Sequence, residues 1–336
     1  MTRRGQHRLL ELVQSFFQQY LRGTRGASDH TVRAYREALR LFFMFLVGRR
    51  SRSAADLDLD DLQVDAVLAF LDHVESQRGN SVATRNCRLV AIRSFVRHLL
   101  RHDLSRADQY GRILAIGSKR APIRVVTYLE PEDARAVIGA VDMRSRHAAR
   151  DRALLLLLYN TGARVSEALA IRPRALQLDR LPRVRVLGKG AKERECPLWS
   201  ETTTALRRLV RTDEVDQPVF RNARGEPLTR DGVAYILNKY VRRAAEARPH
   251  LRTRRITPHV LRHSCAAGLL QAGIDVSVIR DYLGHASVAT TSRYITSNLK
   301  MKRDVLDAFW KRAGLKATSR ARGYPSSKLL AWLQSV

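Results

Sequence analysis

Cysteine is scarce in this sequence, and the few cysteines lie far apart. Cys87, Cys196 and Cys265 form no CxxC pair, which excludes a disulfide-rich scaffold and favours a reducing compartment. Long apolar stretches are also missing. The longest run, Ala153–Tyr159, is far shorter than the roughly 20 residues that span a bilayer, and the basic N-terminus lacks the apolar core of a signal peptide. We therefore expect a cytoplasmic protein that does not enter a membrane.

Acidic residues are few compared with basic ones. The sequence has 32 Asp and Glu against 61 Lys and Arg, a formal net charge of +29. Such an excess favours a polyanionic partner. The 336 residues, with 45% hydrophobic content, suffice for a buried core and fit two domains better than one. Because the arginines are spread through periodic apolar segments, we expect a folded basic protein rather than a disordered tail.

Apolar residues at helical spacing predict four helices in the first hundred or so residues. They cover residues 6–22, 28–48, 59–78 and 81–102. The polar face of the fourth is almost entirely arginine, with Arg85, Arg88, Arg93 and Arg97. From residue 114 to 126 the periodicity is lost, and Pro122 disfavours a helix. We therefore predict a helical domain over residues 6–113 and a basic extended linker over 114–126.

The region from Thr127 onward mixes helices with a β-hairpin. A mostly buried helix is predicted to end at Thr161–Gly162, and LPRVRVLGKGAKERECPL reads as two short strands joined by a glycine-rich turn. Further helices are expected from about residue 203 and over 229–247, 258–272, 276–283, 287–297 and 302–313. Residues 127–313 thus predict a second, α+β domain, and 314–336 an appended tail. The expected fold class is mainly α with a small β-sheet.

The segment TPHVLRH, residues 257–263, suggests a phosphate cradle. Thr257 is a plausible N-cap, so His259 and Arg262 would share one face in the first turn of a helix, beside unpaired backbone N–H groups. Taken alone, the pair is most simply a surface HxxR pair. His259 and His263 have the spacing of zinc ligands, but the metalloprotease glutamate and a third ligand are missing, so we expect no metal.

Three other segments carry candidate residues, each with an ordinary structural alternative. Arg164 follows the predicted helix end at Gly162 and can hold a phosphate by two hydrogen bonds, with Glu167 one turn later to orient it or a neighbour. Lys189 lies at the predicted hairpin tip. His285 follows a predicted glycine cap, and Tyr294 lies about two turns into the next helix. A tyrosine of ordinary pKa near 10 is a poor nucleophile without neighbouring cations or a base.

In combination and in order, these segments resemble the tyrosine recombinase (phage integrase) family, in its Xer-like and mobile-element branch. The matching motifs are TGxRxSE, GKGxKER, HxLRH, LGH and a tyrosine nine residues after the histidine of LGH. The resemblance extends from about Leu10 to Ala313. It implies a SAM-like four-helix core-binding domain followed by a tyrosine recombinase catalytic domain.

The resemblance also implies a chemistry in which Tyr294 attacks a scissile phosphate and forms a 3′-phosphotyrosyl link. The implied catalytic residues are Arg164, Lys189, His259, Arg262, His285 and Tyr294. The two arginines would neutralise phosphate charge, and Glu167 would support them. His259 would assist proton removal from Tyr294, and Lys189 would protonate the leaving oxygen. His285 would hydrogen-bond the phosphate, and no metal or other cofactor would be needed.

The implied partner is double-stranded DNA, bound by a homotetramer on paired sites, with a second recombinase as a further candidate partner. DNA contacts are expected at Arg85, Arg88, Arg93, Lys119 and Arg120. The helix expected around residues 303–310 either docks on a neighbouring protomer or packs on its own domain. We favour the integrase or transposase of a mobile element. The alternatives are a chromosomal Xer-type resolvase of dimers, a type IB topoisomerase and a non-catalytic architectural DNA-binding protein.

Overall fold

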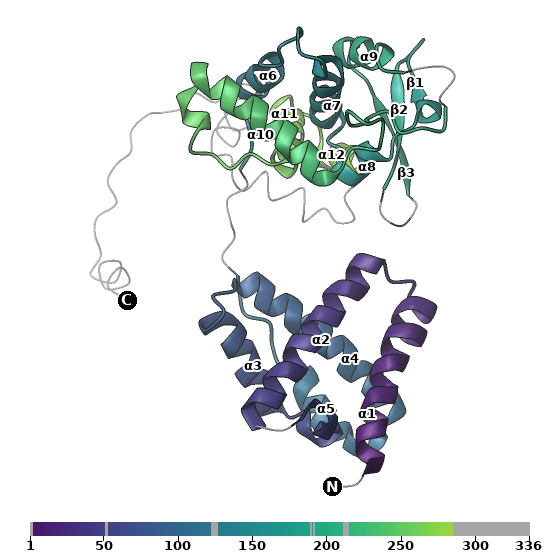
Figure 1. Ribbon diagram of the computed structural model, residues 1–336, viewed down its shortest axis with the longest axis vertical. Helices are drawn as coiled ribbons and strands as arrows, with labels where there is room; N and C mark the ends of the chain where they lie inside the picture. The colour runs from purple at the N-terminus through teal and green to yellow at the C-terminus, as the bar shows by residue number, and fades with distance from the viewer. Residues whose placement is uncertain are drawn as a thin grey trace, which may run out of the picture. The chain divides into compact units, whose positions relative to one another are not determined.

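The computed structural model describes residues 3–50, 53–121, 127–188, 190, 192–210 and 215–284. Its contacts divide the chain into two compact units, residues 1–124 and 125–336 (Figure 1). The predicted fold class is confirmed: both units are mainly helical, and one contains a small sheet. None of the described helices combines the length and apolar character needed to cross a membrane. The helices expected at 287–297 and 302–313 and the tail lie outside the described residues.

The N-terminal unit contains the four predicted helices and one that was not predicted. Its α-helices are α1 (Arg3–Ser15), α2 (Asp29–Arg50), α3 (Val64–Ser76), α4 (Val82–His102) and α5 (Ala107–Leu114). Three 3-10 turns lie at Ala54–Asp56, Leu59–Asp61 and Leu104–Arg106, and a π-helix, Phe16–Thr24, continues α1. The third helix begins later than predicted because Asp58 caps the 3-10 turn that precedes it.

Aromatic side chains fill the core of this unit. Phe16, Phe42, Phe70, Phe95 and Tyr110 are almost fully buried. The Phe16 and Phe95 rings meet edge to face with centroids 5.3 Å apart, an arrangement that stabilises aromatic pairs. The buried face of α4 therefore packs in the same core as Phe16.

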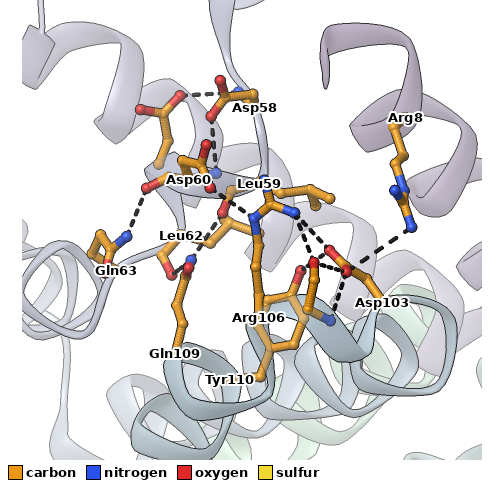
Figure 2. Close-up of polar contacts among 12 residues, drawn as sticks. Arg8, Asp58, Leu59, Asp60, Leu62, Gln63, Asp103, Arg106, Gln109 and Tyr110 are labelled. Carbon is orange, nitrogen blue, oxygen red and sulfur yellow. Dashed lines mark hydrogen bonds and ion pairs between the residues drawn. The ribbon is translucent and has the colours of Figure 1, made fainter. Parts of the chain in front are cut away.

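A buried carboxylate, Asp103, ties the end of α4 to its surroundings (Figure 2). It accepts hydrogen bonds from Arg106 at 2.9 Å and from the Tyr110 hydroxyl at 3.3 Å, and Arg8 of α1 lies 4.0 Å away. Arg106 also donates to Asp60 at 2.7 Å. These contacts neutralise a charge that would be costly to bury alone, and they join α1, α4 and α5.

The C-terminal unit combines helices with a small antiparallel sheet. The elements are α6 (Pro131–Gly139), α7 (Ala148–Thr161), α8 (Val165–Leu169), β1 (Leu176–Gln177), β2 (Arg183–Leu187), β3 (Glu193–Pro197), α9 (Ser200–Arg207), α10 (Arg230–Ala247), α11 (Pro258–Gln271) and α12 (Val276–Leu283), with 3-10 turns at Pro173–Ala175 and Pro249–Leu251. The strand order is β1-β2-β3. Arg183 pairs with Pro197 and Leu187 with Glu193, so the predicted hairpin is confirmed. The two-residue strand β1 was not predicted.

Helix α7 forms the centre of this unit. Its apolar run Leu154–Leu158 is buried on every side, as expected for a helix without a polar stripe. It lies among α6, α9 and α11, and the sheet contacts α8 and α12 (Figure 1). Because α7 ends at Gly162, the loop that follows emerges from the rigid core, and that loop carries Arg164.

Candidate active site

The ends of several helices meet around one pocket of the C-terminal unit. Its volume is about 300 Å³. The lining residues come from the loop after α7 and from α8, α10 and α11: Ala163, Arg164, Val165, Ser166, Arg230, Ala234, Pro258, His259 and Arg262. Three of the residues predicted from sequence, Arg164, His259 and Arg262, therefore share one pocket. Two guanidinium groups, those of Arg164 and Arg262, and the imidazole of His259 therefore line the same space.

The first turn of α11 presents His259 and Arg262 on one side. Thr257 caps the helix by accepting a hydrogen bond from the Val260 N–H at 3.4 Å, and Pro258 occupies the first helical position, as predicted. His259 is exposed, whereas Arg262 is only 4% exposed. The cap fixes the helix start, so the imidazole can meet a ligand while the guanidinium beneath it stays fixed.

Arg262 is held by two backbone carbonyl groups. Its Nη1 donates to the Gly162 oxygen at 2.5 Å and its Nη2 to the Leu283 oxygen at 2.7 Å. These carbonyls belong to the C-terminal ends of α7 and α12, where helix dipoles favour a cation. Arg262 therefore joins α11 to the ends of α7 and α12. Both of these contacts are to backbone carbonyls, and the positive charge of Arg262 lies beside the pocket.

Arg164 is held by Glu167, one turn further along the chain. Its Nη1 donates to Glu167 Oε1 at 2.6 Å, and its backbone N–H donates to Oε2 at 2.9 Å. Arg194 of β3 donates to the same carboxylate at 2.8 Å. Burial would raise the pKa of Glu167, but the hydrogen bonds from Arg194 and Arg164 outweigh it and lower that pKa overall. Glu167 is therefore ionised at neutral pH.

His263, one turn after His259, has a different environment. Burial, followed by the charges of His259 and Arg262, lowers the pKa of His263 to about 4. His263 is therefore neutral at physiological pH. Its side chain is half-buried, whereas that of His259 is exposed. Across the described part of the chain, no group of three or more His, Cys, Asp or Glu is placed to hold a metal ion.

Three predicted catalytic residues, Lys189, His285 and Tyr294, lie outside the described residues. The residues directly before two of them are described. Gly188 follows β2, and Gly284 ends α12 in the left-handed conformation at φ 66°, as the sequence predicted. The structure therefore describes the chain as far as the residue before Lys189 and the residue before His285.

The predicted DNA-binding residues belong to the N-terminal unit and differ in their surroundings. Arg85 is only 5% exposed, and its Nη1 lies 3.1 Å from Asn86 Oδ1 and 3.5 Å from the Gly117 carbonyl. Lys119 forms an ion pair with Glu75 at 2.7 Å, and Arg120 is exposed. Arg88 and Arg93 are half-buried, and within the described residues their Nε atoms have no hydrogen-bond partner.

Two arginines near the pocket were not singled out in the sequence. Arg230 opens α10 and lines the pocket, and Arg194 contacts Glu167. A sequence signal for Arg194 existed, because it is the last residue of the GKGxKER motif. In the structure it shares a face of β3 with buried Cys196. A charged residue on the inward face of a strand requires a buried partner.

Comparisons with known proteins match both units. Residues 127–301 match the model described as phage integrase family, and residues 15–103 match that of the phage integrase N-terminal SAM-like domain. The chain is 38% identical over 330 residues to the integrase/recombinase y4rC of Sinorhizobium fredii, covering 98% of each chain. It is 33% identical over 304 residues to tyrosine recombinase XerC of Pelobacter propionicus, covering 89% of this chain and 95% of the relative.

Solved structures share the fold. The XerH site-specific recombinase bound to palindromic difH substrate superposes with a TM-score of 0.68 at 22% identity, covering 88% of this chain and 84% of that one. The Tn1549 transposon integrase in complex with a circular intermediate DNA gives a TM-score of 0.63 at 14% identity, covering 88% and 98%.

Proposed function

Because the chain belongs to the phage integrase family of tyrosine recombinases, we propose that it cuts and rejoins duplex DNA at specific sites through a phosphotyrosyl intermediate. The observation that carries the proposal is the single pocket lined by Arg164, His259 and Arg262. Two fixed guanidinium groups and an accessible imidazole suit a phosphodiester. The pocket offers cations for the negative charge and a group that can exchange a proton.

The two arginines would stabilise the transition state of phosphoryl transfer. As the nucleophile attacks, negative charge grows on the non-bridging oxygens of the phosphate. Arg164 and Arg262 are already held by Glu167 and by backbone carbonyls, so little reorganisation is needed when that charge develops. Preorganised electrostatic stabilisation of this kind is often the largest catalytic contribution.

The covalent step is proposed for Tyr294. Its phenolic oxygen would attack phosphorus, forming the tyrosyl–phosphate bond as the bond to the 5′-oxygen breaks. His259 would accept the phenol proton, Lys189 would donate a proton to the 5′-oxygen, and His285 would hydrogen-bond the phosphate. Attack by the 5′-hydroxyl of a partner strand reverses these steps. The bond energy is kept in the phosphotyrosyl link, so no cofactor is required.

Of the two histidines in the first turns of α11, His263 is a poor candidate for the proton acceptor. His259 is exposed at the pocket, whereas the low pKa of His263, about 4, makes its imidazole a weak base. General bases are most effective when their pKa lies near the working pH. We therefore assign the proton transfer to His259.

Duplex DNA is the proposed partner, held by both units and by a homotetramer on paired sites. The formal charge of +29 supports a polyanion, and the structural neighbours XerH and Tn1549 integrase are complexes with DNA. In the N-terminal unit, Arg88, Arg93 and Arg120 are the proposed phosphate contacts. Arg85 and Lys119 already bind groups of their own unit, so their contribution would be to shape this surface.

We assign the biological role to a mobile element. The role is supported by y4rC, which is named an integrase/recombinase and is 38% identical over 98% of the chain. XerC of P. propionicus is 33% identical over 89% of the chain. The alternative, a chromosomal Xer-type enzyme, is favoured by the number of XerC and XerD relatives. Recombination between DNA segments flanking the gene, and none at a single chromosomal site, would support the mobile-element role; the reverse result would support the Xer role.

Covalent trapping tests the chemistry. Nicked suicide duplexes from the flanks of the gene would be incubated with the wild type and with Tyr294→Phe, and complexes that resist SDS would be scored. We expect an adduct with the wild type and none with Tyr294→Phe. DNA binding without an adduct across all flanking sequences would contradict the proposal and point to an architectural protein.

A further inference from the structure

Arg194 of β3 connects α8, which lines the pocket, to the end of α12. Its side chain is about 10% exposed. Nη2 donates to Glu167 Oε2 at 2.8 Å, and Nε donates to the Tyr282 carbonyl in the last turn of α12 at 3.0 Å. One planar guanidinium therefore fixes the carboxylate that holds Arg164 and the end of a distant helix.

Two glycines pack directly against this guanidinium. A Cβ atom on Gly284 would lie 3.2 Å from Arg194 Nη1, and one on Gly188 would lie 3.5 Å from the same atom and 3.6 Å from Glu167 Oε1. Gly188 directly precedes Lys189 in the sequence, and Gly284 directly precedes His285. The side chain of Arg194 therefore lies beside the described residue that precedes Lys189 and the one that precedes His285.

The charges explain why a cation is needed at this position. Glu167 is 6% exposed and lies between the guanidinium groups of Arg164 and Arg194. Two cations share one carboxylate, so the cluster keeps one net positive charge. Without Arg194, Glu167 would cancel the charge of Arg164, and partial burial would make that cancellation strong.

We propose that Arg194 is a positioning residue of the phosphate site, which neutralises Glu167 so that the charge of Arg164 remains available to the scissile phosphate. Its guanidinium also packs beside the backbone of Gly188 and Gly284. This inference rests on the proposed function, because the phosphate is that of the DNA strand being cleaved.

Single-turnover cleavage of a nicked suicide duplex at saturating protein tests the inference. We expect Arg194→Gln to bind DNA with the affinity of the wild type and to cleave it more slowly, by roughly 10-fold to 100-fold, as for lost supporting contacts at other active sites. The matched control is Arg183→Gln. Arg183 is half-exposed on neighbouring β2 and pairs with Glu195 at 3.2 Å, so this variant should cleave at the wild-type rate.

Charge restoration separates an electrostatic role from a structural one. The double variant Glu167→Gln with Arg194→Gln again has one positive charge, that of Arg164, and should cleave several-fold faster than Arg194→Gln. Arg194→Lys keeps the charge and should stay within a few-fold of the wild type. Circular dichroism melting would show that each variant is folded.

The outcomes distinguish the two proposals. If the wild type cleaves but the double variant is no faster than Arg194→Gln, or folded Arg194→Lys is equally slow, the charge does not act through Glu167 and the inference is overturned. Wild-type cleavage matched by Arg194→Gln overturns it as well and leaves the recombinase function intact. A wild type that binds the duplexes without forming an adduct overturns the recombinase function and this inference together.

Discussion

Arg262 donates a 2.5 Å hydrogen bond to the carbonyl oxygen of Gly162, although the two residues are 100 positions apart in the chain. Gly162 ends α7 in the left-handed conformation at φ 57°, which turns its carbonyl towards α11. The bond joins the helix that forms the core of the C-terminal unit to the helix that carries His259. The stability of this unit and the geometry of its pocket therefore depend on the same contact.

Replacing Arg262 should reduce both stability and cleavage. Arg262→Gln removes charge-assisted hydrogen bonds to two buried carbonyls, so we expect the free energy of unfolding to fall by about 2–4 kcal/mol. The single-turnover cleavage rate should fall roughly 100-fold or more. The control is Arg207→Gln, an exposed arginine of α9 paired with Asp179, which should change stability by less than about 1 kcal/mol. Equal stability of the two variants would contradict the anchoring role.

A side chain at position 162 should separate α7 from α12. A Cβ on Gly162 would lie 2.3 Å from Leu283 Cδ2 and 3.3 Å from Cys265 Sγ, so Gly162→Ala adds overpacking, about 1–3 kcal/mol, to the cost of a left-handed alanine, about 1–2 kcal/mol. Gly273 is also left-handed, at φ 80°, but its Cβ would meet nothing within 4 Å. In urea unfolding, the free energy of unfolding of Gly162→Ala should be lower than that of Gly273→Ala by at least about 1 kcal/mol. An equal loss of stability in both variants would refute the steric argument.

Part of this arrangement follows from the sequence, because local rules control it. Thr257 and Pro258 predicted the start of α11, and the bounds predicted for the next helix, 276–283, agree with α12. Capping residues and glycines that permit a left-handed end act within a few positions. The order of the motifs also singled out Arg164, His259 and Arg262, which line one pocket in the structure.

Other features could not be predicted because they depend on distant contacts. Helix α5 is only eight residues long, too short to be stable alone. It is held by Gln109, whose amide donates to the carbonyls of Leu59 at 2.9 Å and Leu62 at 2.8 Å. The partners of Arg194 are 27 and 88 positions away, so no spacing rule reveals them. The placements of Lys189, His285 and Tyr294 remain predictions.

The Asp103 network should make the N-terminal unit sensitive to acid. Burial would raise the pKa of Asp103, but hydrogen bonds from Ser105 and Arg106 outweigh it and lower that pKa below its ordinary value. A depressed pKa contributes stability above the unfolded value of about 3.9, and the contribution is lost as pH falls through the folded pKa. Asp103→Asn should cost about 2–3 kcal/mol at pH 7 and flatten the loss of stability below about pH 4.

An exposed carboxylate of the same unit provides the comparison. Asp65 is largely exposed and pairs with Arg49 at 3.4 Å, so Asp65→Asn should cost less than about 1 kcal/mol and leave the acid dependence unchanged. Denaturant melts at a series of pH values measure both effects. An Asp103→Asn variant that keeps the wild-type pH dependence would show that another group causes the acid sensitivity.

Salt dependence of DNA binding tests the arginine face of α4. If Arg88 contacts a phosphate, Arg88→Gln should weaken binding to all duplexes alike and reduce the slope of log Kd against log salt concentration by about 1. Arg112 of α5 lies in a pocket with Asp65 and Asp108, so Arg112→Gln removes the same charge without a proposed DNA contact. Fluorescence anisotropy titrations should separate the two variants; equal slopes would remove Arg88 from the DNA-binding surface.

Peptide mapping of the trapped covalent complex tests the central claim most directly. After nuclease and trypsin digestion of the adduct, mass spectrometry would locate the nucleotide on one of the 10 tyrosines of the chain. We predict that the nucleotide mass lies on the peptide containing Tyr294, linked through a 3′-phosphate. A nucleotide on any other residue, or a link through a 5′-phosphate, would contradict the assignment of Tyr294 as the nucleophile.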